Sequence, residues 1–143
     1  MTFESSAPLR IHVVGIRYDA GKPPGTIEPA PIDFALMRSW LGRAYPIAEI
    51  IWSQLTVDFP IPWSFTACDV SSYLIQIRAL DVANGTDART HYYGMVPDDG
   101  GTKSMRGAAS AIPAAIDPSA VASGPTGVPR YNFAWDRDGS YGD

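Results

Sequence analysis

The side chains that could bind a metal ion are few in this chain and lie far apart in the sequence. They are His12, His91 and the single cysteine, Cys68. Zinc sites need three or four His, Cys or carboxylate ligands at defined spacing, and the chain contains no His-x-x-x-His pair. We therefore assign no metal ligand. The lone cysteine also excludes an internal disulfide, and we interpret it as a small core residue.

Other motifs that carry chemistry are incomplete. The chain has no Gly-x-Ser-x-Gly nucleophile elbow, and its glycines at positions 100, 101 and 107 do not have the spacing of a phosphate-binding loop. Asp136 and Asp138 match only the first two ligand positions of an EF-hand loop, which also needs later oxygen ligands and a final Glu. We assign no catalytic residue, and we expect no cofactor in the chain itself.

The composition is typical of one globular domain. The chain has 143 residues, of which 45% are hydrophobic and 18% charged, and its formal net charge is −4. It has no Lys/Arg cluster that could follow a phosphate backbone, so we expect no nucleic-acid partner. We also expect no membrane span, because no apolar run approaches the roughly 20 residues that a span needs. The N-terminal residues do not have the pattern of a signal peptide.

Three stretches before position 100 are predicted strands. Thr90 to Val96 is rich in aromatic and β-branched residues and lies between two turn sequences, so we expect it to be the central strand of a sheet. Residues 9–18 and 47–57 alternate between apolar and polar side chains, which is typical of strands. His12 shares the polar side of its strand with Arg10, and we interpret it as a solvated edge residue.

Two amphipathic helices are predicted between these strands. Asp33 is a plausible N-cap for the first helix, which would extend to residue 44. The second helix would start near Asp69 or Ser71 and end before Asn84. Helical spacing predicts that one face of each helix is buried: Phe34, Met37, Trp40, Leu41 and Ala44 in the first, and Val70, Tyr73, Leu74, Ile77 and Leu80 in the second.

Residues 105–112 and 120–124 are predicted to be two further strands, both built from small side chains. The expected fold class is therefore α/β, with a mixed, mostly parallel twisted sheet of about five strands and two main helices. We expect a single domain over residues 1–143. Residues 1–8 would form a loose leader, residues 9–124 the α/β core, and residues 125–143 a tail rich in Gly, Pro and Asp.

This order of elements is similar to the upper subdomain of the metzincin zinc metallopeptidases, and most of all to the reprolysin (adamalysin) arrangement. The residues that carry the resemblance are Arg78 to Leu80, His91 to Pro97, Arg106 to Ala109 and Val121 to Pro125. In bacterial metallopeptidases of this kind, a comparable series leads into the zinc helix, His-Glu-x-x-His-x-x-Gly-x-x-His. Trp135 to Asp143 resembles the approach to that helix. The zinc ligands, the general-base Glu and the Met-turn have no counterpart in these 143 residues.

The resemblance implies a role for the small-residue strand. In the family, this strand is the antiparallel edge of the sheet and accepts the peptide substrate as an added strand. Here the substrate-binding residues would be Arg106, Gly107, Ala108, Ala109 and Ser110. The resemblance further implies a secreted parent endopeptidase that uses zinc, of which this chain is the scaffold and substrate-edge half, without activity of its own.

A further expectation concerns association. The zinc helix of the family covers part of one sheet face, and an exposed apolar face of that kind is rare in monomers. We therefore expect that the chain self-associates, or that its residues 125–143 fold back over the sheet.

Two other functions remain open. The chain could be a non-enzymatic α/β module that binds a protein or a glycan through the exposed sheet edge and the aromatic residues Trp52, Trp63, Tyr92 and Tyr93, although such side chains are more often found in a core. The other alternative is a small α/β enzyme with a site around His91.

Overall fold

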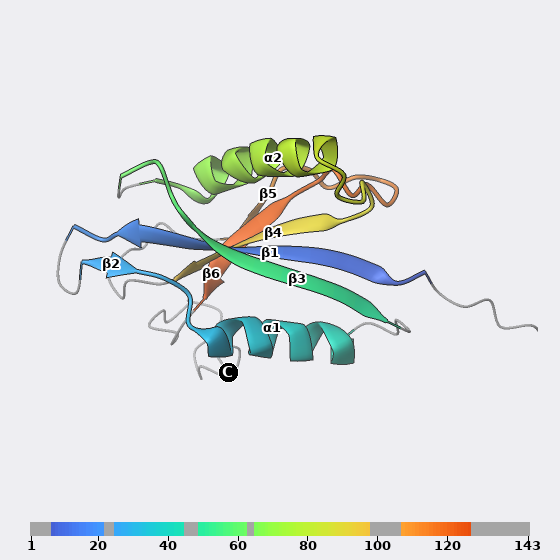
Figure 1. Ribbon diagram of the computed structural model, residues 1–143, viewed down its shortest axis with the longest axis horizontal. Coiled ribbons are helices and arrows are strands. Elements are labelled where there is room, and N and C mark those ends of the chain that lie inside the picture. Colours follow the sequence, from blue (N-terminus) through green and yellow to red (C-terminus); the bar gives the residue numbers. More distant parts are fainter. Residues whose placement is uncertain (1–6, 22–24, 45–48, 63–64, 98–106, 127–143) are drawn as a thin grey trace, which may run out of the picture.

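The computed structural model describes residues 7–21, 25–44, 49–62, 65–97 and 107–126. These residues form a mixed sheet of six strands with helix α1 on one face and helix α2 on the other (Figure 1). The elements in chain order are β1 (Leu9–Asp19), β2 (Thr26–Ile27), α1 (Pro31–Ala44), β3 (Ile50–Asp58), α2 (Ala67–Ala83), β4 (His91–Pro97), β5 (Ala108–Ala109) and β6 (Ala122–Thr126). The predicted α/β class is confirmed.

The sheet is mostly parallel. Strand β4 lies between β1 and β6 and is parallel to both. Strand β3 is also parallel to β1, and because residues 11–15 of β1 pair with both β3 and β4, these two strands lie on opposite sides of β1. Strand β5 is antiparallel to β6 at one edge, and the short β2 is antiparallel to the end of β1. The expected interior position of the Thr90–Val96 stretch is therefore confirmed, with β4 covering His91–Pro97.

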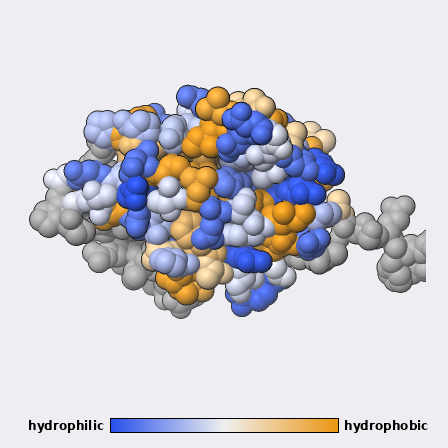
Figure 2. Space-filling model, in the orientation of Figure 1, coloured by the Kyte–Doolittle hydropathy of each residue, from blue (hydrophilic) through white to orange (hydrophobic). Residues whose placement is uncertain are grey.

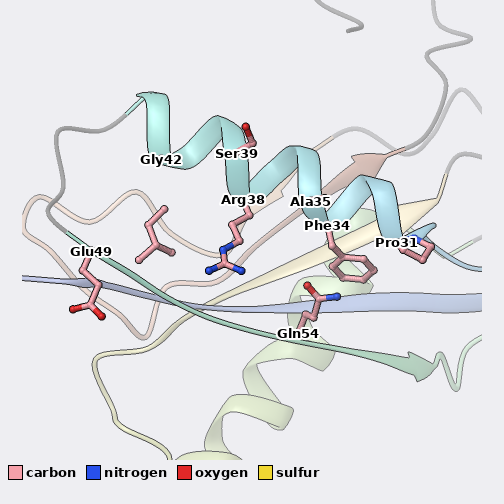
Figure 3. Close-up of a pocket in the computed structure, with 9 residues that line it drawn as sticks. Pro31, Phe34, Ala35, Arg38, Ser39, Gly42, Glu49 and Gln54 are labelled. Carbon is pink, nitrogen blue, oxygen red and sulfur yellow. The ribbon is translucent and has the colours of Figure 1, made fainter.

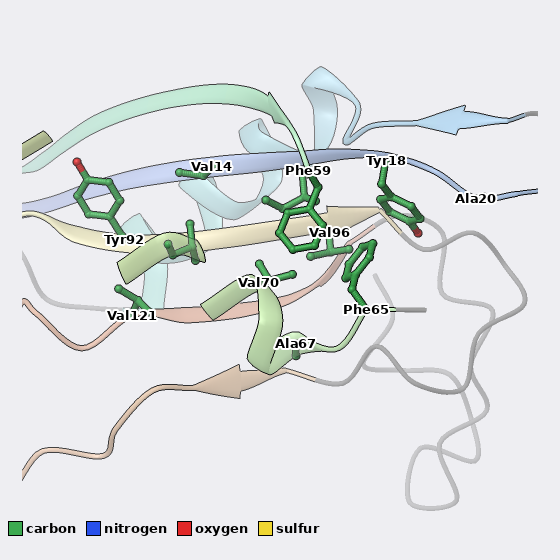
Figure 4. Close-up of a cluster of buried hydrophobic side chains, with 12 residues drawn as sticks. Val14, Tyr18, Ala20, Phe59, Phe65, Ala67, Val70, Tyr92, Val96 and Val121 are labelled. Atoms are coloured by element: carbon green, nitrogen blue, oxygen red, sulfur yellow. The ribbon is translucent and has the colours of Figure 1, made fainter. Parts of the chain in front are cut away.

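The larger part of the core lies between the sheet and α2 (Figure 4). Alternate residues of β1 and β4 point to this side, and Val70 and Leu74 of α2 are fully buried against them. Edge-to-face packing of Tyr18 on Phe65, with ring centroids 4.9 Å apart, closes one end of this cluster. The buried members are Val14, Ile16, Tyr18, Ala20, Phe59, Phe65, Ala67, Val70, Leu74, Tyr92, Val96 and Val121.

A smaller cluster lies between the sheet and α1. Phe34 and Leu41 of α1 are buried against Ile11, Val13 and Met95. The predicted inner face of α1 is thus correct for Phe34 and Leu41, and Met37 is partly buried. It is wrong for Trp40, which is 56% exposed, and for Ala44, which is also exposed.

Both helices begin earlier than predicted, for the same reason. Asp33 is not the N-cap of α1. Its Oδ2 accepts from the Ala30 amide at 2.7 Å, and the helix begins at Pro31. In α2 the N-cap is Thr66, whose hydroxyl accepts from the Asp69 amide while the Asp69 carboxylate accepts from the Thr66 amide. A carboxylate in the third helical position stabilises free amides as well as an N-cap does, and the sequence pattern does not separate the two.

Several strand and burial predictions also need correction. The predicted strand 105–112 is reduced to Ala108–Ala109, because the Ser110 hydroxyl rather than a backbone carbonyl accepts from the Val121 amide, which ends the ladder. The strand predicted over 120–124 covers Ala122–Thr126. Leu80 is 65% exposed and Cys68 is also exposed, so neither is a core residue. The predictions for residues 1–6, 47–48, 105–106 and 127–143 lie outside the described residues.

Candidate functional site

The predicted substrate edge lies at β5. Ala108 and Ala109 form this strand, Gly107 precedes it and Ser110 follows it, while Arg106 lies outside the described residues. Ala108 pairs with Ser123 and Ala109 with Ala122. Within the described part of the chain, β6 is the only strand that pairs with β5. The edge is therefore short, and its residues are exposed except for the half-buried Ala108.

The backbone of β5 presents its free groups at two residues. The Ser110 amide donates to the Val121 carbonyl at 2.8 Å, so the backbone of Ser110 faces β6. Backbone groups of successive strand residues point to alternate edges, and the same ladder makes Ala108 face β6. Gly107 and Ala109 consequently direct their N–H and C=O groups outward, where an extended peptide could add.

The small side chains at this edge also have a packing role. A Cβ atom added to Gly124 of β6 would lie 2.5 Å from the Tyr93 hydroxyl. The same atom would lie 3.8 Å from the Gly107 Cα. Glycine at position 124 therefore makes room for the Tyr93 ring under the edge, independently of any ligand.

The two histidines lie on opposite faces of the sheet and cannot share a metal ion. His12 pairs with Tyr92, which belongs to the α2 side of the core, whereas His91 is the neighbour of Tyr92 and points to the α1 side. The described residues contain no group of three or more His, Cys, Asp or Glu side chains that could hold a metal ion. The described residues do not form a zinc site, and we assign no metal-dependent catalytic step to them.

His12 is more enclosed than the sequence predicted. Strand β1 is an interior strand, so His12 is half-buried on the α2 face rather than solvated. Its Nδ1 lies 2.7 Å from the Ser53 hydroxyl, and its ring centroid lies 5.0 Å from that of Tyr92. Among the described residues, its buried Nε2 has no hydrogen-bond partner. Burial lowers the pKa of His12, and the nearby Asp81 carboxylate opposes this shift.

The His12–Ser53 contact alone does not make a catalytic pair. A serine nucleophile needs a base that is itself oriented by a third group, and the free Nε2 shows that the described residues supply none. The carboxylate of Asp81 accepts instead from the Tyr92 hydroxyl at 2.7 Å. This cluster was missed from the sequence because its members come from β1, β3, β4 and α2.

His91 borders a shallow hollow of about 700 Å³. Leu9, Ala120 and residues 113–117 line the rest of it. Burial and, next, the Arg78 guanidinium lower the pKa of His91, while Asp117 opposes them. The Asp117 carboxylate accepts from the Ser119 amide and hydroxyl at 2.9 and 2.7 Å. Asp117, the acidic residue that raises the pKa of His91, is therefore already hydrogen-bonded within a local turn.

A second hollow was not predicted. It is a groove of about 740 Å³ between α1 and β3 (Figure 3). Arg38 projects into it from α1, and Gln54 lines it from β3. Nothing in the sequence distinguishes Arg38 from any other charged residue on a helix, because the groove depends on which strand lies at the sheet edge.

The aromatic residues of the proposed interaction surface are divided between core and surface. Tyr92 is buried, Tyr93 and Trp52 are half-buried, and Trp63 lies outside the described residues. On the face shown in Figure 2, apolar residues lie in separate groups between polar ones.

Comparison of the chain with protein-family models, curated proteins and solved structures finds no match in any of the three. The helices of the described segments are all too short or too polar to cross a membrane.

Proposed function

We propose that this chain is the scaffold and substrate-edge half of a secreted, metzincin-type zinc endopeptidase, and that an extended peptide substrate adds as a strand to β5. The observation that supports the proposal is the position of the small-residue strand. Residues 108–109 pair antiparallel with β6 at the edge of the described sheet, with the backbone groups of Gly107 and Ala109 directed outward. This is the arrangement needed for strand addition.

The catalytic part of the proposal is separate from these residues. Zinc, the expected cofactor of the complete enzyme, has no ligand set in the described segments. The zinc ligands and the general base would come from polypeptide other than these 143 residues. The quickest test is to read the coding sequence that follows Asp143. A His-Glu-x-x-His motif within about twenty codons supports the proposal, and a stop codon favours the non-enzymatic alternative.

Peptide binding to β5 can be tested directly. The probe is a heptapeptide amide, Thr-Val-Thr-Gln-Thr-Val-Thr, that carries fluorescein on its N-terminal amine, and its binding is followed by fluorescence anisotropy. Ala109→Pro should abolish the β5-dependent binding, because proline removes the outward N–H without breaking a bond to β6. Ala109→Ser keeps that N–H and is the matched control. Equal affinities of the two variants would contradict the proposal.

A further inference from the structure

The opposite edge of the sheet is longer than the edge at β5. Strand β3 has nine residues and pairs along its whole length with β1. In the described part of the chain, no strand lies on its other side. Among the described strands, none pairs with the backbone donors and acceptors along the outer edge of β3.

The direction of these groups follows from the two ends of the ladder. The Leu9 amide donates to the Glu49 carbonyl at one end, and the Phe59 amide donates to the Arg17 carbonyl at the other. Odd-numbered residues of β3 thus face β1, and even-numbered residues direct their N–H and C=O groups outward. The outward set consists of Ile50, Trp52, Gln54, Thr56 and Asp58.

Strand β3 carries few of the features that protect an edge. Natural edge strands are usually short, or contain Pro, Lys or a bulge, because an open edge pairs with other chains. Here the nine residues include no Pro and no Lys, and the ladder with β1 runs in register without interruption. The other edge strands of the described sheet, β2 and β5, have only two residues each. An open edge of this length favours a strand partner.

A groove runs beside this edge and can accept side chains. The side chains of the outward set point to the α1 side of the sheet, since Ile50 and Trp52 pack on the α1 cluster. Across the groove, α1 presents the small residues Ala35, Ser39 and Gly42. Every second side chain of an added strand would enter this space of about 740 Å³ (Figure 3).

The charge in the groove selects the ligand. Arg38 projects from α1 toward the strands and is exposed (Figure 3). Within the described segments, Arg38 forms no ion pair, whereas Arg10, Arg17 and Arg89 each pair with an acidic residue. A guanidinium in a partly enclosed groove binds a carboxylate with charge-assisted hydrogen bonds. Glu49 lies at the end of the groove where β3 begins, so the acidic residue would sit toward Gln54.

We propose that β3 is a second peptide-binding edge, at which an extended peptide adds as a strand and places an acidic side chain against Arg38. This site is independent of the endopeptidase proposal. Its occupant is an extended peptide segment with one Asp or Glu among uncharged residues.

The test compares two heptapeptide amides with the same label. One has the sequence Thr-Val-Thr-Glu-Thr-Val-Thr, and the other has Gln in place of Glu. In anisotropy titrations at low ionic strength, we expect the Glu peptide to bind about tenfold more tightly. Arg38→Gln should remove this difference without weakening the Gln peptide. A Glu preference that persists in Arg38→Gln, or no saturable binding of the Glu peptide, would overturn the proposal.

The edge itself is tested with Gln54→Pro, which removes an outward N–H and no bond to β1. Gln54→Ala, which keeps the N–H, is its control. Gln54→Pro should abolish the Arg38-dependent preference for the Glu peptide and Ala109→Pro should not, whereas the reverse pattern would assign that preference to β5. Two further Glu peptides, one N-methylated at the odd residues and one at the even residues, keep the test valid should Gln54→Pro fail to fold. Because the N–H groups of an added strand alternate between its two edges, one of these peptides must lose affinity, and unchanged binding of both would refute strand addition.

Discussion

The position of His12 inside the sheet disfavours its protonated form. Burial lowers its pKa from the ordinary value of 6.5, and the charge of Asp81 on α2 only partly offsets this effect. The other groups that face the ring, Ser53 and Tyr92, are neutral at pH 7. Protonation therefore adds a charge in a place where the described residues offer Nε2 no acceptor.

This position predicts a pH dependence of stability. The pKa of His12 is lower in the folded chain than in the unfolded chain, so below about pH 6.5 the unfolded state binds the proton more strongly. The free energy of unfolding should be constant above this pH and fall as the pH decreases. His12→Gln should weaken the fall, as measured by urea unfolding between pH 5 and 8. The pKa of His91 is also lowered, so His91 contributes to the same pH dependence. His91→Gln, measured in parallel, gives the size of that contribution. Equal slopes for the wild type and His12→Gln would contradict the prediction.

Gly94 permits close packing of α2 on the centre of the sheet. A Cβ atom at this position would lie 2.8 Å from Val70 Cγ1 and 2.9 Å from Leu74 Cδ1, both of them fully buried. Gly94→Ala should therefore reduce the free energy of unfolding by about 1–3 kcal/mol, the usual cost of overpacking. A Cβ atom at Gly107 would lie 3.4 Å from the nearest atom, so Gly107→Ala should reduce the free energy of unfolding much less. Thermal unfolding of both variants measures the two changes. Equal effects of the two substitutions would show that the helix can shift.

At the scale of elements, α2 covers the sheet with only part of its apolar stripe. Leu74 is fully buried, whereas Leu80 is 65% exposed. The last turns of α2 lie beside the connection to β4, where the Arg78 guanidinium donates to the Thr90 and Ala88 carbonyls. The periodicity of the stripe continues beyond the strands that it could cover, and this is why the sequence predicted Leu80 to be buried.

The two leucines give a direct comparison within one helix. Leu74→Ala should lower the free energy of unfolding by about 2–5 kcal/mol, because it leaves a cavity between α2 and β4. Leu80→Ala should change it by less than about 0.5 kcal/mol. Chemical denaturation measures both values. A large effect at position 80 would mean that this side chain is covered in solution.

Features that depend on residues close together in the sequence could be predicted, whereas features that depend on contacts between distant segments could not. The alternation in β1 and β4 and the helical spacing of Val70 and Leu74 are local patterns, and they identified the fold class and the central strand. The candidate sites depend on non-local facts. Arg38 lines a groove only because β3, rather than a later strand, forms the edge beside α1. No local pattern encodes that choice.

At the scale of the whole molecule, the described part of the sheet ends in edge strands of unequal length. The β5 edge has two residues and the β3 edge has nine. The expected self-association was argued from an uncovered sheet face, but in the described segments each face carries a helix (Figure 1). An open edge strand is the alternative route, because unpaired backbone groups template pairing with a second chain.

Association of the folded chain should therefore proceed through β3. We expect light scattering to develop on prolonged incubation at high protein concentration, and Gln54→Pro should reduce it, because proline blocks the pairing of two β3 edges. Ala109→Pro, at the short edge, should leave it unchanged. A control separates this effect from a difference in stability between the variants. The Glu heptapeptide is added to the wild-type chain, where it covers the same edge without a substitution. It should suppress scattering to a similar extent. Scattering that is insensitive both to Gln54→Pro and to the peptide would contradict the prediction. The chain would then associate through a surface other than the β3 edge.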